Sequence, residues 1–253
     1  MKWREKSITS SCRPILKACG ETSWKQGVNS SMEPQSHQLL TELQHKFIHV
    51  FVQIPEHSFF YLTGGTALAE FYLGHRLSFD LDFFTSEDGL IQPFSFQFEE
   101  LVKKSGLQVK VMRRMTSYVE WLITDDDDVL KVDLALDSPY RFDNPVLCPP
   151  GIWVNNYEDL AVDKTLAYYG RAEPRDAVDL FFILKILDHK ILLDKAKQKD
   201  PGFDLYWFAI ALNRSLNFPD EPERWPVNML MEWDPKQIKE ALSALAIEIM
   251  DGL

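Results

Sequence analysis

Two aspartates stand one residue apart inside the otherwise apolar stretch Phe79–Phe84. If this stretch forms a β-strand, its side chains alternate between two faces, so Asp80 and Asp82 point the same way, roughly 6–7 Å apart. Aspartate is a poor strand former, and a buried, unpaired carboxylate is costly. Because Mg²⁺ prefers oxygen ligands, the pair predicts a site for one or two Mg²⁺ ions, with Mn²⁺ as a substitute. The alternative is a pair of surface acids on a half-exposed strand.

A glycine pair, Gly64-Gly65, precedes these acids and is followed by Thr66. Residues 58–63 favour a short buried strand, and Thr66 to Leu73 favour a helix. Glycines let a backbone approach a phosphate closely, and a helix start offers it free N–H groups, to which Thr66 can add a hydroxyl. The order strand, glycines, helix therefore predicts a phosphate-binding turn beside the acids. By themselves the glycines indicate only a tight turn.

A third acid, Asp133, lies in the alternating stretch Lys131–Leu136. Alternation places Val132, Leu134 and Leu136 on one face of a strand and Asp133 on the other. Three acids on one sheet face, next to a phosphate-binding turn, suit a two-metal phosphoryl-transfer reaction. An ion pair between Asp133 and Lys131 is the alternative reading.

The elements that must position these residues follow from apolar periodicity. The N-terminal half mixes strands and helices, whereas the chain after residue 155 reads as helical throughout. The expected helices are 38–53, 66–73, 93–105, 157–170, 174–190, 204–213 and 235–250, and the expected strands are 58–63, 79–84, 107–115, 117–124 and 129–137.

These elements predict an α+β fold with a mixed sheet and flanking helices, followed by a helical C-terminal domain. Prolines and a glycine at 139, 145 and 149–151 mark the boundary. We expect a disordered extension over 1–31, an α+β domain over 32–150 and a helical domain over 151–253. Met32 offers an alternative start of the chain.

Composition excludes several classes of protein. The net charge of −11 argues against a broad surface that coats nucleic acid, although it leaves room for a local groove. The three cysteines form neither a metal-binding spacing nor a disulfide framework, which favours the reducing cytoplasm. No apolar run reaches membrane-spanning length, and the N-terminus lacks the apolar region of a signal peptide.

Residues 64–84, GGTALAEFYLGHRLSFDLDFF, closely resemble the first motif of the AbiEii/AbiGii nucleotidyltransferase toxin family, within the DNA polymerase β-like nucleotidyltransferases. Residues 131–134 resemble the family's single-acid motif. Residues 159–167 are similar to its lysine-bearing helix, and residues 175–180 to the Arg-Asp-x-x-Asp-Leu helix that follows. The resemblance spans about residues 60 to 185 and implies a nucleotidyltransferase-like sheet.

The resemblance also implies residue roles. Gly64, Gly65 and Thr66 would hold the triphosphate, and Asp80 and Asp82 would bind Mg²⁺. Asp133 would complete the metal site and accept the proton of the attacking hydroxyl, directly or through the metal.

Further implied residues lie in the helices after the boundary. Lys164 would neutralise phosphate charge, and either Asp176 or Asp179 would be the acid of the fourth motif. Arg175, and Arg76 of the first motif, are additional candidates for contact with the nucleotide, and a structural role that braces the carboxylates is the alternative for Arg76. For the helix residues, surface ion pairs and a solvated lysine are the alternatives.

The implied reaction is attack of an acceptor hydroxyl, on an RNA such as a tRNA or on a protein, at the α-phosphorus of an NTP. The implied biological role is the toxin of a toxin–antitoxin or phage-exclusion system, with an antitoxin encoded nearby. A nucleotide-binding module of the same fold without turnover is the rival hypothesis, but such a module would be expected to lose one of the three acids. A different acceptor, such as a small molecule, is a third.

Overall fold

The computed structural model describes residues 32–253, so the predicted extension over 1–31 lies outside the described residues. Its helices are α1 (Glu42–Phe51), α2 (Gly64–Leu68), α3 (Ile91–Ser105), α4 (Tyr157–Arg171), α5 (Pro174–Leu184), α6 (His189–Lys199), α7 (Leu205–Asn213) and α8 (Pro235–Asp251). Its strands are β1 (Tyr61–Thr63), β2 (Leu81–Thr85), β3 (Gln108–Met115), β4 (Tyr118–Asp125), β5 (Asp128–Leu136), β6 (Val146–Cys148) and β7 (Ile152–Val154). Short helical turns are η1 (Pro55–Phe59), the π-helical η2 (Ala69–Leu73), η3 (Arg214–Asn217) and η4 (Pro222–Arg224).

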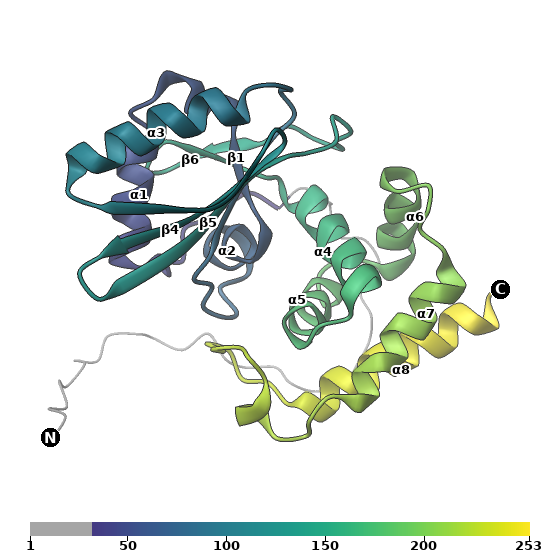
Figure 1. The fold of residues 1–253 in the computed structure, drawn as a ribbon. Coiled ribbons are helices and arrows are strands. Elements are labelled where there is room, and N and C mark those ends of the chain that lie inside the picture. Colours follow the sequence, from purple (N-terminus) through teal and green to yellow (C-terminus); the bar gives the residue numbers. More distant parts are fainter. Residues whose placement is uncertain (1–31) are drawn as a thin grey trace, which may run out of the picture.

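All seven strands form one mixed sheet in the order β3-β4-β5-β2-β1-β7-β6. β2 pairs in parallel with β5, and β1 pairs in parallel with β7, whereas the other neighbours are antiparallel. Helices flank this sheet, and α4 to α8 follow it in the chain and gather at one end of the molecule (Figure 1). The predicted α+β class, with a mixed sheet followed by C-terminal helices, is confirmed.

One face of the sheet is buried beneath α1 and α3 (Figure 1). Phe47 and Phe51 of α1 meet Phe94 and Phe98 of α3 over Phe83 of β2, with the rings of Phe51 and Phe83 stacked at 4.3 Å. Burying each such ring contributes about 1.5–3 kcal/mol, and paired rings add to this. This face holds the core and fixes the register of β2.

The opposite face of the sheet is only half-buried. Burial alternates along β2 and β7 and along β5 from Leu130, and the half-exposed positions include Asp82, Phe84, Asp133 and Trp153. Alternation therefore separates an apolar core face from a face that carries the predicted acids.

The sheet continues past residue 150, because β7 pairs with β1 before helices take over at Asn156. Asn156 caps α4 by accepting from the Asp159 backbone N–H. The division of the chain into domains at 150 and 151 stays a prediction. In the part of the chain that the structure describes, every helix is too short or too polar to cross a membrane.

Two predicted strands are shorter than expected. Residues 58–63 give only β1, since Pro55 starts the 3₁₀ turn η1, which runs to Phe59. The stretch predicted as strand 79–84 pairs only from Leu81, so Asp80 lies just before β2 rather than within it.

The C-terminal half holds elements that periodicity alone did not predict. The expected helix 174–190 ends at Leu184, and a separate helix α6 begins after Asp188, whose side chain accepts from two backbone N–H groups of that helix. The β6–β7 hairpin was also not predicted, because strands of three residues are too short to show alternation.

Candidate active site

The register of three neighbouring strands places Thr63, Asp82 and Asp133 side by side. Asp82 is opposite Thr63 of β1 on one side and opposite Asp133 of β5 on the other. Neighbouring strands lie about 4.8 Å apart, so these side chains form one row on the half-exposed face. Asp80 lies two residues before Asp82, just outside β2, and its charge acts on Asp82.

Asp82 is an acid whose ionised form is disfavoured by its surroundings. Burial, reinforced by the neighbouring carboxylate of Asp133, raises the pKa of Asp82 to about 6, and the charge of Lys164 opposes this rise. Desolvation of the buried carboxylate is the main cause of the shift, and the like charge of Asp133 adds to it. The positive charge of Lys164 offsets this rise only in part.

Asp133 already has partners in the protein. Its carboxylate accepts from the Tyr118 hydroxyl at 2.8 Å and from Lys131 Nζ at 2.5 Å. Burial and this hydrogen bond raise the pKa of the Tyr118 hydroxyl, so it remains a donor. The predicted ion pair of Asp133 with Lys131 is thus present, on the same face as Asp82.

Within residues 32–253, no three His, Cys, Asp or Glu side chains converge tightly enough to form a metal site by themselves. The donor set nevertheless fits a divalent cation. Asp82 and Asp133 supply hard oxygen ligands in adjacent strands. The pKa of Asp82 is raised, and a bound cation would favour the ionised form of this carboxylate. Mg²⁺ binding by Asp80, Asp82 and Asp133 stays a prediction.

The glycine pair lies where neither residue has space for a side chain. Gly64 has φ of +72°, and a Cβ there would overlap the Asp82 carboxylate. A Cβ on Gly65 would come within 2.6 Å of Arg76 Nη2 and 2.9 Å of Ser78 Oγ. Backbone, carboxylate and guanidinium therefore meet within one small volume.

Thr66 connects helix α2 to the start of strand β2 by a hydrogen bond. Helix α2 begins at Gly64, earlier than expected, so Thr66 lies inside the first turn and is buried. Its hydroxyl donates to the backbone carbonyl of Asp80. In this structure Thr66 therefore holds the start of β2 against α2, and contact of its hydroxyl with a nucleotide stays a prediction.

A buried ion cluster lies behind this turn, built around the fully buried Asp179 of α5. Arg76 donates to both carboxylate oxygens, at 2.7 and 2.9 Å, and His75 Nε2 contacts the first oxygen at 2.8 Å. Lys164 Nζ of α4 lies 2.7 Å from the second oxygen. Burial alone would raise the pKa of Asp179, but the charges of Arg76 and Lys164 hold it well below its usual range.

Asp176 has a similar but smaller role one turn earlier. Its buried carboxylate receives a two-point contact from Arg171, at 2.6 and 2.9 Å, and lies 3.7 Å from Lys164 Nζ. Arg171 and Lys164 both act electrostatically on Asp82. Asp176 and Asp179 thus face the cations of the site, and a catalytic role for either stays a prediction.

The C-terminal part of the chain also braces this region. The backbone around Asn228 to Met231 pairs with the segment that carries His75 and Arg76. Leu77 N–H donates to the Asn228 carbonyl at 2.8 Å, and Leu230 N–H donates to the His75 carbonyl at 2.9 Å. The position of Arg76 therefore depends on contacts from a segment that lies about 150 residues later in the sequence.

The structure brings most of the predicted residues together but not all. Arg175 lies apart: its half-exposed side chain contacts Glu173 at 3.8 Å. Ser78 and Tyr118 are close to the site although the sequence did not single them out. Ser78 could have been found from its place two residues before Asp80, whereas Tyr118 depends on pairing that only the fold reveals.

Comparisons with known proteins agree with this geometry. A model of the family described as "Nucleotidyl transferase AbiEii toxin, Type IV TA system" matches residues 47–201. A relative from Aquifex aeolicus, described as an uncharacterized protein, is 32% identical over 174 residues, which cover 65% of this chain and 76% of that protein.

Two solved structures share the fold. One is an H. pylori protein described as a candidate nucleotidyltransferase, with a TM-score of 0.54, 21% identity, and coverage of 85% of this chain and 97% of that one. The other is JHP933 from Helicobacter pylori, with a TM-score of 0.50, 19% identity, and coverage of 85% and 94%. At these identities the likeness shows a common fold.

Proposed function

The chain belongs to the AbiEii nucleotidyltransferase toxin family, and from that membership we propose that it transfers a nucleoside monophosphate from an NTP to a hydroxyl of an RNA, such as a tRNA, with Mg²⁺. One observation carries the proposal: the backbone of Gly64 lies directly against the Asp82 carboxylate, which is beside Asp133. A phosphate chain that follows the glycine turn would therefore pass the acids.

The glycine turn and its cations would hold the triphosphate. Gly64 and Gly65 begin helix α2, whose first backbone N–H groups would face the phosphates, and the Arg76 guanidinium lies beside Gly65. Lys164 and Arg171 supply further positive charge next to Asp82. Asp179 and Asp176 would act by holding these cations in place, because each carboxylate is buried and paired with them.

Asp82 and Asp133, with Asp80 before them, would hold the metal. Mg²⁺ bound there supplies Lewis-acid stabilisation of the charge that develops on the phosphoryl oxygens. In the proposed reaction the acceptor oxygen forms a bond to the α-phosphorus, and the bond from that phosphorus to the bridging oxygen breaks, releasing pyrophosphate. The hydroxyl proton passes to Asp133, whose orientation Tyr118 fixes.

The family's description as part of a type IV toxin–antitoxin system supports a cellular role as a toxin. We propose that a neighbouring gene encodes an antitoxin that limits this activity. Growth arrest on expression, relieved by the neighbouring gene and absent for Asp82→Asn, is the expected result in cells.

The test in vitro is transfer of label from each α-³²P NTP to total RNA and total protein, with Mg²⁺ or Mn²⁺. We expect label on RNA with the wild type and with Asp127→Asn, which removes an exposed acid in the β4–β5 turn. Asp82→Asn should reduce transfer at least about a thousandfold, because several kcal/mol of charge stabilisation are lost.

The outcomes separate the candidate functions. NTP binding without any transfer would favour the nucleotide-binding module. Label on protein alone would exclude RNA as the acceptor. Equal transfer by the wild type and Asp82→Asn would show that the reaction does not use this site.

A further inference from the structure

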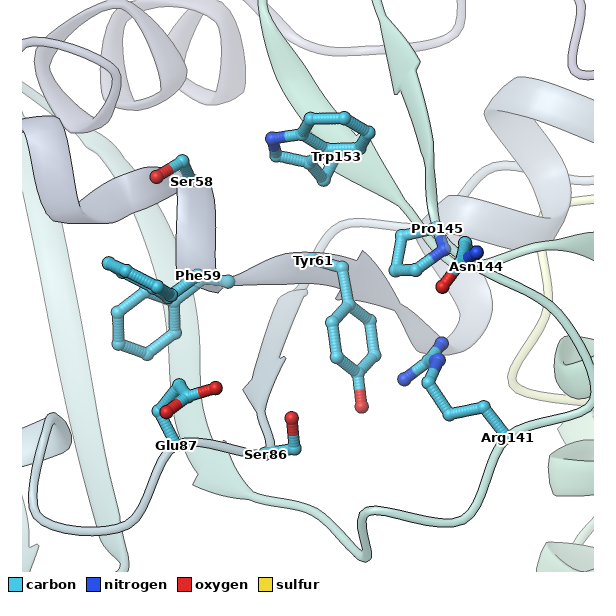
Figure 2. Close-up of a pocket in the computed structure, with 10 residues that line it drawn as sticks. Ser58, Phe59, Tyr61, Ser86, Glu87, Arg141, Asn144, Pro145 and Trp153 are labelled. Atoms are coloured by element: carbon cyan, nitrogen blue, oxygen red, sulfur yellow. The ribbon is translucent and has the colours of Figure 1, made fainter.

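An open hollow with aromatic walls lies on the half-exposed face of the sheet, outside the ion cluster (Figure 2). Its volume is about 490 Å³, within the range of small-molecule sites. Phe59, Tyr61 and Trp153 surround it, and Arg141 closes one side. We call it the aromatic hollow. Phe59 is 51% exposed, so its ring is accessible to a ligand in the hollow.

The strand register places the aromatic hollow next to the acids. Tyr61 and Trp153 are register partners in β1 and β7, and Tyr61 is also opposite Phe84 of β2. Two residues further along β1 comes Thr63, the partner of Asp82. Tyr61 and Thr63 share a face about 6–7 Å apart, so the hollow adjoins the row of acids.

The order of residues along β1 indicates on which side of the acids the aromatic hollow lies. Tyr61 comes first, then Thr63 beside Asp82, then the glycine turn at Gly64. The acids therefore lie between the aromatic hollow and the proposed triphosphate position. In an in-line displacement the attacking oxygen approaches from the side opposite the leaving pyrophosphate. The hollow is consequently on the acceptor side of the reaction.

The chemistry of the walls selects a flat, uncharged group. Arg141 lies over the Tyr61 ring at 3.9 Å, donates to Asn155 and is 3.9 Å from the Asp137 carboxylate, so its charge already has a partner. Tyr61 donates to Asp137, and Glu87 adds a negative charge to the rim. A free phosphate gains little here. Phe59 is exposed and Trp153 is partly exposed, whereas the Tyr61 ring is buried beneath Arg141. The two accessible rings favour stacking of a planar heterocycle, which is how proteins commonly hold unpaired bases.

We propose that the aromatic hollow binds an unpaired nucleobase of the RNA acceptor, next to the nucleotide whose hydroxyl is attacked. This rests on the proposed function for the reaction but on separate residues for the contact. Phe59 and Trp153 supply the stacking surfaces, and Tyr61 lines the hollow next to Arg141 (Figure 2). None of the three is placed in the metal or triphosphate site.

The test measures RNA binding without catalysis. The probe is a fluorescein-labelled single-stranded octaribonucleotide of mixed sequence, with anisotropy recorded in low salt, without NTP or metal. Loss of one stacked base should weaken binding at least about fivefold. We expect this for Phe59→Ala and Trp153→Leu, recovery for Phe59→Tyr, and no change for Trp207→Ala, an exposed aromatic on α7.

Thermal melting of each variant checks folding, and Phe59→Ala is chosen first because Phe59 is exposed. A duplex of the same sequence should bind less well than the single strand, since its bases are already paired. In the transfer reaction Phe59→Ala should raise KM for RNA and leave KM for NTP unchanged.

Failure of this inference and failure of the proposed function are distinguishable. Transfer to RNA with unchanged probe affinity in Phe59→Ala and Trp153→Leu would overturn the inference alone. Probe binding that depends on Phe59 without any transfer would support the hollow as an RNA site and overturn the proposed reaction. Absence of probe binding by the wild type, or transfer to protein alone, would overturn the inference.

Discussion

The negative charge of Asp82 is disfavoured by its surroundings, which makes protein stability depend on the protonation of this residue. Its pKa rises from 3.8 to about 6 on folding. A raised pKa means that the protonated form stabilises the fold below about pH 4, and that this contribution is lost as the pH rises through 6. Without metal, Asp82→Asn should therefore be more stable than the wild type at pH 7.5, by about 1–3 kcal/mol.

The measurement is urea unfolding in EDTA, for the wild type and Asp82→Asn, between pH 4 and 8. The difference in unfolding free energy should be small at pH 4 and grow toward neutral pH. Asp127→Asn is the matched control for the loss of one negative charge at an exposed position. A stability difference that does not change with pH would contradict the inference that the negative charge of Asp82 is unfavourable in the folded protein.

Asp179 differs from Asp82, because the cations around Asp179 stabilise its negative charge. Asp179→Asn would leave Arg76 and Lys164 buried with a neutral partner. Removing one member of a buried ion cluster typically costs about 3–5 kcal/mol. We expect a loss of this size in chemical unfolding, and weaker NTP binding because both cations face the proposed triphosphate position.

The matched control for Asp179 is Glu173→Gln at the N-cap of the same helix, where the carboxylate is half-exposed and 3.8–3.9 Å from Arg171 and Arg175. An exposed pair of this kind contributes at most about 1 kcal/mol. If Asp179→Asn unfolded at the same urea concentration as Glu173→Gln, Asp179 would not hold the cluster together.

At the residue scale the sequence was informative where a side chain conflicted with its local pattern. Asp82 and Asp133 occupy alternate positions in otherwise apolar strands, so their common face could be predicted. Asp179 lies in a helix that carries acids at ordinary spacing, and its partners His75 and Arg76 are about 100 residues away. No local pattern contains such a pairing, which is why the choice between Asp176 and Asp179 stayed open.

The element that most constrains the site is the turn from β1 into α2. Gly64 needs its positive φ and also the absence of a side chain, since a Cβ would overlap Asp82. Gly89 has a similar φ of +75° but open space around it. Alanine substituted at each position separates two effects. Backbone strain is common to Gly64 and Gly89, whereas the close approach to Asp82 occurs only at Gly64.

Both substitutions should destabilise the protein by about 1–2 kcal/mol through the left-handed backbone. Only Gly64→Ala should also displace Asp82, and displacement by about 1 Å costs roughly a hundredfold in rate. The measurements are thermal unfolding and NMP transfer for each variant. Equal transfer by Gly64→Ala and Gly89→Ala would show that the contact with Asp82 is unimportant for the reaction.

Elements were predictable in proportion to their length and periodicity. The strands β4 and β5 alternate over most of their eight and nine residues, and their bounds differ from the prediction by one residue at each end. The β6–β7 hairpin has strands of three residues, so sheet pairing rather than local sequence determines it. Helix α6 was not distinguished because the cap at Asp188 lies within an apolar-periodic stretch.

At the scale of the whole molecule, the sheet provides the acids and the C-terminal helices provide the cations. Lys164 and Arg171 come from α4, and Asp176 and Asp179 from α5, whereas Asp82 and Asp133 come from β2 and β5. Backbone hydrogen bonds from the segment near Asn228 fix the loop that carries Arg76. The site therefore exists only when both parts of the chain are docked, and a ligand at the site should stabilise the whole protein.

Mg²⁺ offers the clearest test of this linkage. A ligand present at 100 times its Kd adds about 2.7 kcal/mol to the unfolding free energy, which for a chain of this size raises Tm by about 5–10 °C. Because the net charge is −11, any salt also screens repulsion, so KCl at matched ionic strength must be the reference. We expect a Mg²⁺-specific rise in Tm for the wild type and for Asp127→Asn. Asp82→Asn and Asp133→Asn should lose it, because each lacks one carboxylate of the adjacent pair. A rise of equal size in all four proteins would mean that Mg²⁺ acts by screening, and that the paired acids do not form a metal site.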